Sequence, residues 1–156
     1  SISIMLPLLV IVMMRWDKYC IIPCIVYAIL FVFYHRGSFA QYLIYLIGNL
    51  GFMLSLLYLN KVGKEKIRKT FYGSALFLIT GFLLMELSRG LASMLISGTN
   101  PYVIIEFILT DMLSLVFGIL VIIIVRQVDG LFVDQKEYLL QINSQEEKID
   151  GGWQDE

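Results

Sequence analysis

Four ionisable residues lie inside apolar stretches that are long enough to cross a membrane, where charge is costly and therefore informative. Glu86 and Arg89 belong to one such stretch, and Glu106 and Asp111 belong to the next. Ionisable groups at such positions are rare and usually face a protein interior or an aqueous cavity. Three carboxylates beside one guanidinium leave up to two acids without a basic partner, and such an acid takes up a proton or recruits a cation. This set indicates an intramembrane polar site for a small cationic or zwitterionic solute, a metal ion or a proton-coupling step.

Helical periodicity places these residues on shared faces. Glu86 and Arg89 are three residues apart, so they lie on one side of a helix. On the next helix, Asp111 falls within an arc of about 140° that also contains Glu106. The other members of that arc are small or hydroxyl residues, namely Thr110, Ser114 and Gly118.

The connection between these two helices sets their relative depth. A loop of five residues separates them, so they are expected to be antiparallel neighbours. Folding this hairpin places Arg89 at a depth between Glu106 and Asp111. Asn49, on an earlier helix, lies at a similar depth. We therefore expect Glu86, Arg89, Glu106, Asp111 and Asn49 to form a ligand-binding site in the outer half of the membrane.

The same residues also fit a structural role. Arg89 can neutralise Asp111 or Glu106 and fasten the helical hairpin, with serine and threonine hydroxyls bonding across the interface. A line of small residues at seven-residue spacing on the Arg89 helix is explained by close helix packing. These small residues are Ser74, Gly81 and Ser88.

The elements that would position this site are membrane helices. Of the 156 residues, 58% are hydrophobic and 16% are charged, and the mean hydropathy is +0.78. A soluble domain is about 45–50% apolar and about 25% charged, and a chain this short could not bury so much apolar surface. The composition also excludes disorder, and a net charge of −1 offers no basic field for nucleic acid. We expect an all-α, multi-pass integral membrane protein with the lipid bilayer as its surroundings.

Five apolar stretches divide the chain, and three of them are long enough to cross a hydrocarbon core of roughly 30 Å. The first two are short and contain Pro7 and Pro23, which leaves open two short helices, a re-entrant hairpin or spans in a thinned bilayer. We favour two short helices, because one continuous helix would place Arg15 and Lys18 at mid-membrane. The first stretch lacks the flanks of a signal peptide, so we expect it to belong to the mature protein. The expected spans are Ile2–Met14, Cys20–Tyr34, Phe39–Asn60, Phe71–Ile96 and Tyr102–Val125.

The distribution of charge predicts an orientation and two parts. Residues 61–69 hold five of the twelve basic residues, whereas residues 97–101 hold none. The positive-inside rule places the first loop in the cytoplasm, which gives five spans with the N-terminus outside and the C-terminus inside. Residues 1–126 carry a net charge of +5 and form the transmembrane domain, whereas residues 127–156 carry −6 and form an acidic cytoplasmic tail. We expect the protein in a bacterial cytoplasmic membrane.

The tail contains a candidate partner-binding helix. A turn at residues 129–130 is expected to precede an amphipathic helix that begins at Leu131. One interpretation lays this helix against the basic loop of residues 61–69, where exposed ion pairs contribute little. The other makes it a docking helix for a membrane or cytosolic partner subunit. Its apolar stripe consists of Leu131, Tyr138, Ile142 and Ile149.

No motif for catalysis, a metal centre or a cofactor accompanies these features in the sequence. The single histidine, His35, lies in a loop, and no metalloprotease, phosphate-binding or paired-cysteine redox motif is present. We interpret Cys20 and Cys24 as small buried thiols, and the methionine and aromatic residues as mostly lipid-facing bulk. We therefore expect no enzymatic activity, no cofactor and no metal centre.

Two functions remain. In size, all-helical composition and outward polar site, the chain resembles the substrate-binding subunits of energy-coupling-factor vitamin transporters. It departs from them in having five predicted spans instead of six and in lacking their small-residue contact motif near the N-terminus. The resemblance implies a small solute bound near the outer face as part of a transport system. The alternative is a non-transporting sensory or assembly subunit whose buried charges are structural and whose C-terminal helix docks a partner. We favour the first, because packing does not require excess buried carboxylates.

Overall fold

The described part of the chain is helical throughout. A computed structural model describes residues 3–128, 131–133 and 135–151, with side chains up to residue 145. No strand occurs in these residues, which confirms the all-helical fold. Four stretches are long and apolar enough to cross a membrane, as expected of a membrane-embedded protein: Met5–Tyr34, Phe39–Val62, Phe71–Ser97 and Val103–Val125. The elements are α1 (Met5–Trp16), η1 (Asp17–Cys20), α2 (Ile21–Tyr34), α3 (Phe39–Gly51), η2 (Phe52–Leu54), α4 (Ser55–Val62), α5 (Lys64–Lys69), α6 (Phe71–Ser97), α7 (Val103–Val125) and α8 (Gln135–Gly151).

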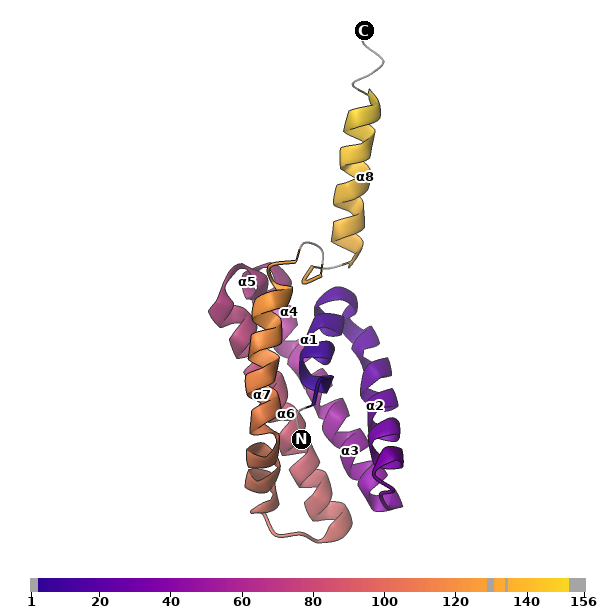
Figure 1. Ribbon diagram of the computed structural model, residues 1–156, viewed down its shortest axis with the longest axis vertical. Coiled ribbons are helices and arrows are strands. Elements are labelled where there is room, and N and C mark those ends of the chain that lie inside the picture. The colour runs from indigo at the N-terminus through magenta and orange to yellow at the C-terminus, as the bar shows by residue number, and fades with distance from the viewer. Residues whose placement is uncertain (1–2, 129–130, 134, 152–156) are drawn as a thin grey trace.

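The first apolar stretch reverses direction within itself. After α1, Asp17 takes a φ of +48°, and the short 3₁₀ segment η1 leads into α2. Ser3 Oγ lies 2.9 Å from the Tyr27 hydroxyl, which joins the start of α1 to the middle of α2. At the turn, the Cys20 thiol donates to the carbonyl oxygen of Leu9 at 3.3 Å. The chain therefore forms two short helices here instead of one continuous helix, as the charged residues of the turn predict (Figure 1).

Helices α3 and α6 approach each other through small residues. A Cβ atom on Gly51 would lie 2.1 Å from Ser88 Oγ, and a Cβ atom on Gly81 would lie 2.3 Å from the ring of Phe52. A Cβ atom at either distance would clash, so glycine at position 51 permits the close approach of α3 to α6, and glycine at position 81 leaves room for the ring of Phe52 in η2. The predicted packing role of the small residues on α6 is consistent with these contacts.

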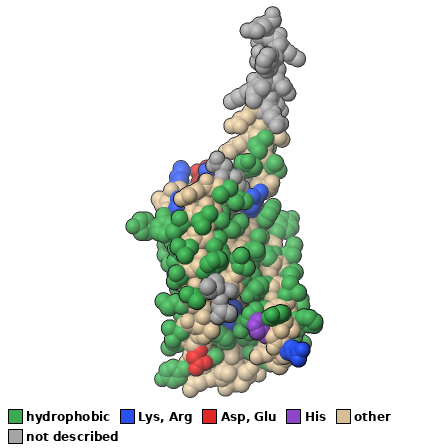
Figure 2. All heavy atoms as spheres, viewed as in Figure 1, with side chains coloured by type: hydrophobic (Ala, Val, Ile, Leu, Met, Phe, Trp, Pro, Cys, Tyr) green, Lys and Arg blue, Asp and Glu red, His purple; other side chains and the backbone are tan. Residues whose placement is uncertain are grey.

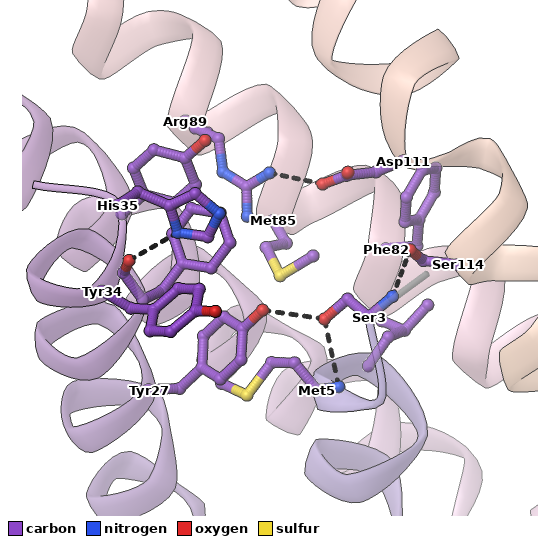
Figure 3. Close-up of a pocket in the computed structure, with 13 residues that line it drawn as sticks. Ser3, Met5, Tyr27, Tyr34, His35, Phe82, Met85, Arg89, Asp111 and Ser114 are labelled. Atoms are coloured by element: carbon purple, nitrogen blue, oxygen red, sulfur yellow. Dashed lines mark hydrogen bonds and ion pairs between the residues drawn. The ribbon is translucent and has the colours of Figure 1, made fainter. Parts of the chain in front are cut away.

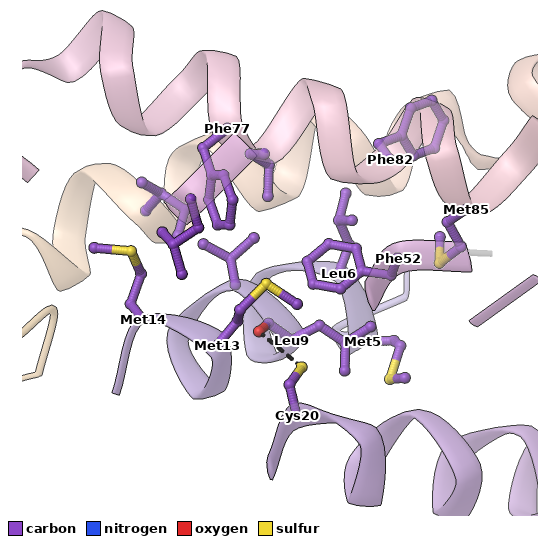
Figure 4. Close-up of a cluster of buried hydrophobic side chains, with 14 of the residues drawn as sticks. Met5, Leu6, Leu9, Met13, Met14, Cys20, Phe52, Phe77, Phe82 and Met85 are labelled. Atoms are coloured by element: carbon purple, nitrogen blue, oxygen red, sulfur yellow. Dashed lines mark hydrogen bonds between the residues drawn. The ribbon is translucent and has the colours of Figure 1, made fainter. Parts of the chain in front are cut away.

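Helix α1 fills the centre of one half of the bundle. Its inward side chains are fully buried, and α6 and η2 supply aromatic rings against them (Figure 4). The buried α1 residues include Leu6, Leu9, Val10, Met13 and Met14, and the rings are those of Phe52, Phe77 and Phe82.

The ends of α6 fix the hairpin that it forms with α7. At its N-terminus, the Thr70 side chain accepts a hydrogen bond from the Gly73 amide at 3.1 Å. At its C-terminus, Gly98 takes a φ of +62°, the left-handed conformation that commonly ends a helix. The returning α7 lies against α6 closely enough that a Cβ atom on Gly90 would meet Ile104 at 2.4 Å. The two helices are thus antiparallel neighbours, as the short loop predicts.

Basic residues gather at the end of the bundle that holds the α1–α2 turn and α5. Lys64 forms an ion pair with Asp17 at 2.8 Å. Arg126 donates to the backbone oxygens of Arg68 at 2.9 Å and Lys69 at 3.3 Å. Figure 2 shows Lys and Arg side chains at the end next to the projecting helix, with a broad apolar surface below them. This distribution of charge and apolar surface is typical of a protein embedded in a bilayer.

The C-terminal helix, α8, begins at Gln135, and the predicted start at Leu131 is wrong. Phe132 is only 2% exposed and packs onto the core of the bundle, which holds residues 131–133 in a turn ahead of the helix. Gln135 then accepts a hydrogen bond from Arg15, next to the α1–α2 turn. Figure 1 shows the remainder of α8 projecting away from the bundle.

This projection corrects the interpretation in which the tail helix lies along the basic loop. Only the first turn of α8 comes near that loop, where Glu137 lines a surface depression together with Lys64 and Lys66. On the predicted apolar stripe, Leu131 is 36% exposed, and Tyr138 and Ile142 are half-buried. The predicted turn at residues 129–130 and the side chain of Ile149 lie outside the described part.

Candidate functional site

Three of the predicted site residues form one ionic cluster between α6 and α7. The Nη1 atom of Arg89 donates to both carboxylate oxygens of Glu86, at 3.1 and 3.0 Å, and to Asp111 Oδ2 at 2.7 Å. Glu86 is fully buried and Arg89 is 4% exposed, whereas the Asp111 side chain is 25% exposed. A guanidinium shared by two carboxylates is held firmly, because charge-assisted hydrogen bonds are strong in a medium of low dielectric constant.

Helix α3 completes the setting of the guanidinium. A Cβ atom on Gly48 would lie 2.8 Å from the Cβ of Arg89, so α3 passes directly beside the base of this side chain. One turn earlier on α3, the Tyr45 ring lies 4.7 Å from the guanidinium carbon, and the Phe107 ring of α7 lies 5.6 Å from it. Both distances are within the range of cation–π attraction.

A cavity of about 310 Å³ adjoins this cluster. Arg89 and Asp111 form part of its wall, and Glu86 does not. Figure 3 shows the guanidinium pointing toward Met85 and Ser3, with Asp111 beside it. The cavity is lined by Ser3, Met5, Leu6, Tyr27, Phe31, Tyr34, His35, Tyr45, Phe82, Met85, Arg89, Asp111 and Ser114.

An aromatic wall on α2 and α3 forms the side of the cavity opposite Asp111. The Phe31 ring lies 4.3 Å from the His35 ring and 4.8 Å from the Tyr45 ring, measured between centroids, and 5.6 Å from Tyr27. His35 Nδ1 is 2.8 Å from the carbonyl oxygen of Phe31, which orients the imidazole at the end of α2. Tyr34 is 83% exposed, so this wall extends from the interior to the surface of the bundle.

Hydroxyl groups close the cavity at the start of α1. The backbone amide of Ser3 donates to Ser114 Oγ on α7 at 2.9 Å, and Ser3 Oγ lies 2.9 Å from the Tyr27 hydroxyl on α2. Ser3, just ahead of α1, is therefore tied to α7 through its backbone amide and to α2 through its hydroxyl. Ser114 belongs to the polar stripe that the sequence predicts on α7, and it is buried.

The other two predicted site residues lie away from the cavity wall. Asn49 is fully buried, but its Nδ2 donates to the carbonyl oxygen of Cys24 at 3.1 Å and so ties α3 to α2. Glu106 is exposed, and its side chain makes no hydrogen bond or ion pair with any described residue. The ionic cluster therefore consists of Glu86, Arg89 and Asp111.

Sequence reasoning did not identify the aromatic wall. The interpretation of aromatic residues as mostly lipid-facing bulk misses Tyr27, Phe31 and Tyr34, which line the cavity from α2, and His35 lines it from the position after α2. Their spacing offered a signal, because residues four, seven and eight positions apart share one face of a helix. What the spacing does not give is whether that face meets lipid or protein.

Neither metal chemistry nor a known relative adds to this description. In the described part of the chain, no group of three or more His, Cys, Asp and Glu side chains is placed to hold a metal ion. No protein-family model, curated protein or solved structure matches the chain. Its function is therefore inferred from the chemistry of the cavity.

Proposed function

We propose that this protein binds a small cationic or zwitterionic solute in the cavity beside Arg89 and Asp111, from the outer side of the membrane, as part of a transport system. The observation that carries the proposal is a cavity of about 310 Å³ whose wall combines these two charged residues with aromatic rings. Ligand sites in proteins are concave and mostly apolar and contain a few convergent polar groups. An ion pair that serves only to join two helices needs no such space beside it.

The charges of the cluster favour a ligand that carries positive charge. Two carboxylates share one guanidinium, so the cluster has an excess of one negative charge when all three groups are ionised. Asp111 is the carboxylate that a solute can reach, because its side chain is 25% exposed and lines the cavity. The neighbouring tyrosine and phenylalanine faces also attract cations.

The proposal includes five helical passes with the N-terminus outside and the C-terminus in the cytoplasm. It is supported by the α1–α2 turn, α5 and Arg126, which lie at one end of the bundle with most of the basic residues. With that end in the cytoplasm, the loops at residues 35–38 and 98–102 face outward and the cavity lies in the outer half. α1 has 12 residues, or about 18 Å of helix, which makes it the shortest of the five.

Native mass spectrometry of protein extracted from its own membrane tests the proposed function. We expect the spectrum to contain the intact protein with a small molecule bound, and the bound mass to disappear in the Asp111→Asn variant. A spectrum of wild-type protein with no bound molecule, together with no ligand-dependent thermal stabilisation by any candidate cation or zwitterion, would contradict the proposal.

The exposed acid on the same helix provides the matched control. Glu106→Gln removes a carboxylate from α7 that neither lines the cavity nor pairs with a described residue. We expect this variant to retain the bound molecule in full. If Glu106→Gln and Asp111→Asn lose it equally, the effect comes from the general charge of the outer surface and not from the cavity.

A second candidate function follows from α8. The helix projects from the bundle, with Tyr138 and Ile142 on its half-buried stripe (Figure 1). In this alternative, the protein is a non-transporting subunit in which the ionic cluster is a brace and α8 docks a partner. Truncation after residue 133 distinguishes the two: it should leave solute binding unchanged under the first proposal and abolish association with partner subunits under the second.

A further inference from the structure

The hydrogen bonds of Arg89 leave part of its guanidinium unused. All of its bonds to Glu86 and Asp111 come from Nη1. Nε is buried without a partner, and none of the hydrogen bonds of Arg89 to described residues uses Nη2. A guanidinium N–H in a site of low dielectric constant gains free energy when it receives an acceptor, and Nη2 has two N–H groups free for one. Nε is enclosed by protein, so Nη2 is the donor through which Arg89, as part of the cavity wall, can meet a ligand.

The neighbouring carboxylate offers the complementary group. Asp111 receives Arg89 through Oδ2, and its side chain is 25% exposed and forms part of the cavity wall. One edge of the cavity wall therefore presents unpaired N–H donors, and a carboxylate oxygen lies next to them. Side by side, these groups match a molecule in which an anionic acceptor and a cationic donor are close together.

The rest of the cavity is suited to a flat apolar group. Tyr27, Phe31 and Tyr34 follow one face of α2, and Phe82 and Met85 lie on α6. Aromatic faces pack well against other rings in offset or edge-to-face arrangements. The volume of about 310 Å³ is at the small end of ligand pockets, which suits one ring system with a short polar head.

We infer that the solute is a compact zwitterion joined to a flat apolar ring, with its carboxylate on the unpaired N–H groups of Arg89 and its ammonium group on Asp111 and the aromatic wall. This inference rests on the proposed function and narrows it from any small cation or zwitterion to one class. A simple cation would leave the donors of Arg89 unsatisfied. A simple anion would bring no cationic group to Asp111 and would be repelled by its carboxylate.

A matched set of probes tests this inference on the wild-type protein in lipid nanodiscs. Phenylalanine is compared with phenethylamine, which lacks the carboxylate, and with 3-phenylpropionate, which lacks the amine. The same three head groups on a naphthyl ring test a larger apolar group without adding a hydrogen-bond donor. In at least one ring series we expect the zwitterion to bind about tenfold or more tightly than either single-charge analogue, because each loses one charge-assisted hydrogen bond.

Two conservative variants assign the two ends of the probe. Arg89→Lys keeps a positive charge opposite Glu86 and Asp111 but removes the second guanidinium edge. It should lower the affinity for phenylalanine to that of phenethylamine and leave phenethylamine unchanged. Asp111→Asn should lower the affinity for phenylalanine to that of 3-phenylpropionate and leave the affinity for 3-phenylpropionate unchanged. Glu106→Gln should change neither preference.

The outcomes distinguish this inference from the proposed function. If phenethylamine or its naphthyl analogue binds as tightly as the zwitterion, the cavity takes simple cations, so the inference is wrong while the proposed function stands. If none of the six probes binds, the inference is also wrong, and the bound mass seen by native mass spectrometry decides the proposed function separately. If Arg89→Lys leaves the preference intact, the carboxylate does not meet Arg89.

Discussion

The two halves of the bundle share the long helix α6 but differ in what occupies their centre: apolar side chains in one, and charged groups beside a cavity in the other. In the packed half, the apolar side chains of α1, including Leu9 and Met14, fill the centre and are fully buried. In the cavity half, beyond the first turn of α1, the centre holds the cluster of Glu86, Arg89 and Asp111 and a space of about 310 Å³. α6 passes through both halves, so the change along its length reflects what lies opposite it.

This difference shows where polar groups are tolerated in a bundle of this size. Where α1 fills the centre, apolar side chains pack together, and the described charged residues that are buried, Glu86 and Arg89, lie in the other half. Where α1 does not fill the centre, Glu86, Arg89 and Asp111 pair with one another, and Arg89 and Asp111 also face the cavity. The variants below test this division, from the largest expected effect to the smallest.

Removal of Arg89 should destabilise the protein most. Arg89→Ala leaves Glu86 and Asp111 facing each other without a cation, and breaking a buried pair in this way costs about 3–5 kcal/mol. The measurement is the free energy of unfolding of wild type and variants, denatured in the same detergent. The control is the triple variant with Glu86→Gln and Asp111→Asn, which should recover most of the loss. If the free energy of unfolding of Arg89→Ala lies within about 0.5 kcal/mol of the wild-type value, the cluster is not a brace.

Two methionines compare the halves directly. Met14 is fully buried in the packed half, whereas Met85 lines the cavity. Met14→Ala should cost about 2–5 kcal/mol, because it opens a new void in a packed core. Met85→Ala should cost less, because it only enlarges a space that exists. Equal losses in the free energy of unfolding would mean that the two halves are packed alike.

A third variant tests whether close packing continues along the α3–α6 interface into the cavity half. A Cβ atom on Gly51 would lie 2.3 Å from the Cβ of Ser88, next to Arg89 in sequence. Gly51→Ala should therefore cost about 1–3 kcal/mol of stability. Adding Ser88→Gly removes the side chain in the way and should return part of that loss. No effect of Gly51→Ala would indicate that the helices are free to separate near the cavity.

The sequence predicts part of this arrangement for clear reasons. The reach of a helical hairpin gives the relative depth of residues on its two arms, and this correctly brings Arg89 to Asp111. It does not give the rotation of α7 about its own axis. The structure turns Asp111, Ser114 and Gly118 inward, at spacings of three and four residues. Glu106 lies five residues before Asp111, about 140° away, and therefore points outward.

The remaining features depend on contacts between elements that are distant in the sequence. The hydrogen bond from Asn49 to the Cys24 carbonyl follows from how α3 meets α2, and periodicity within either helix does not contain it. The aromatic face of α2 has a regular spacing, but lipid and a protein cavity accept the same residue types. The delayed start of α8 depends on Phe132 reaching the core of the bundle. These three features follow from how the helices pack together, which periodicity within a single helix does not give.

The smallest effect is expected where the α1–α2 turn meets α5, at the end of the packed half. The ion pair of Asp17 with Lys64 has an Asp17 side chain that is 49% exposed, so water and salt screen it. Asp17→Asn should cost about 0.2–1 kcal/mol, and the loss should shrink as salt is added. Glu65→Gln, which removes an 80% exposed acid 3.9 Å from Lys69, is the control and should change stability still less. A loss from Asp17→Asn as large as that from Met14→Ala would mean that the charged turn, and not apolar packing, holds α1 in the centre of the bundle.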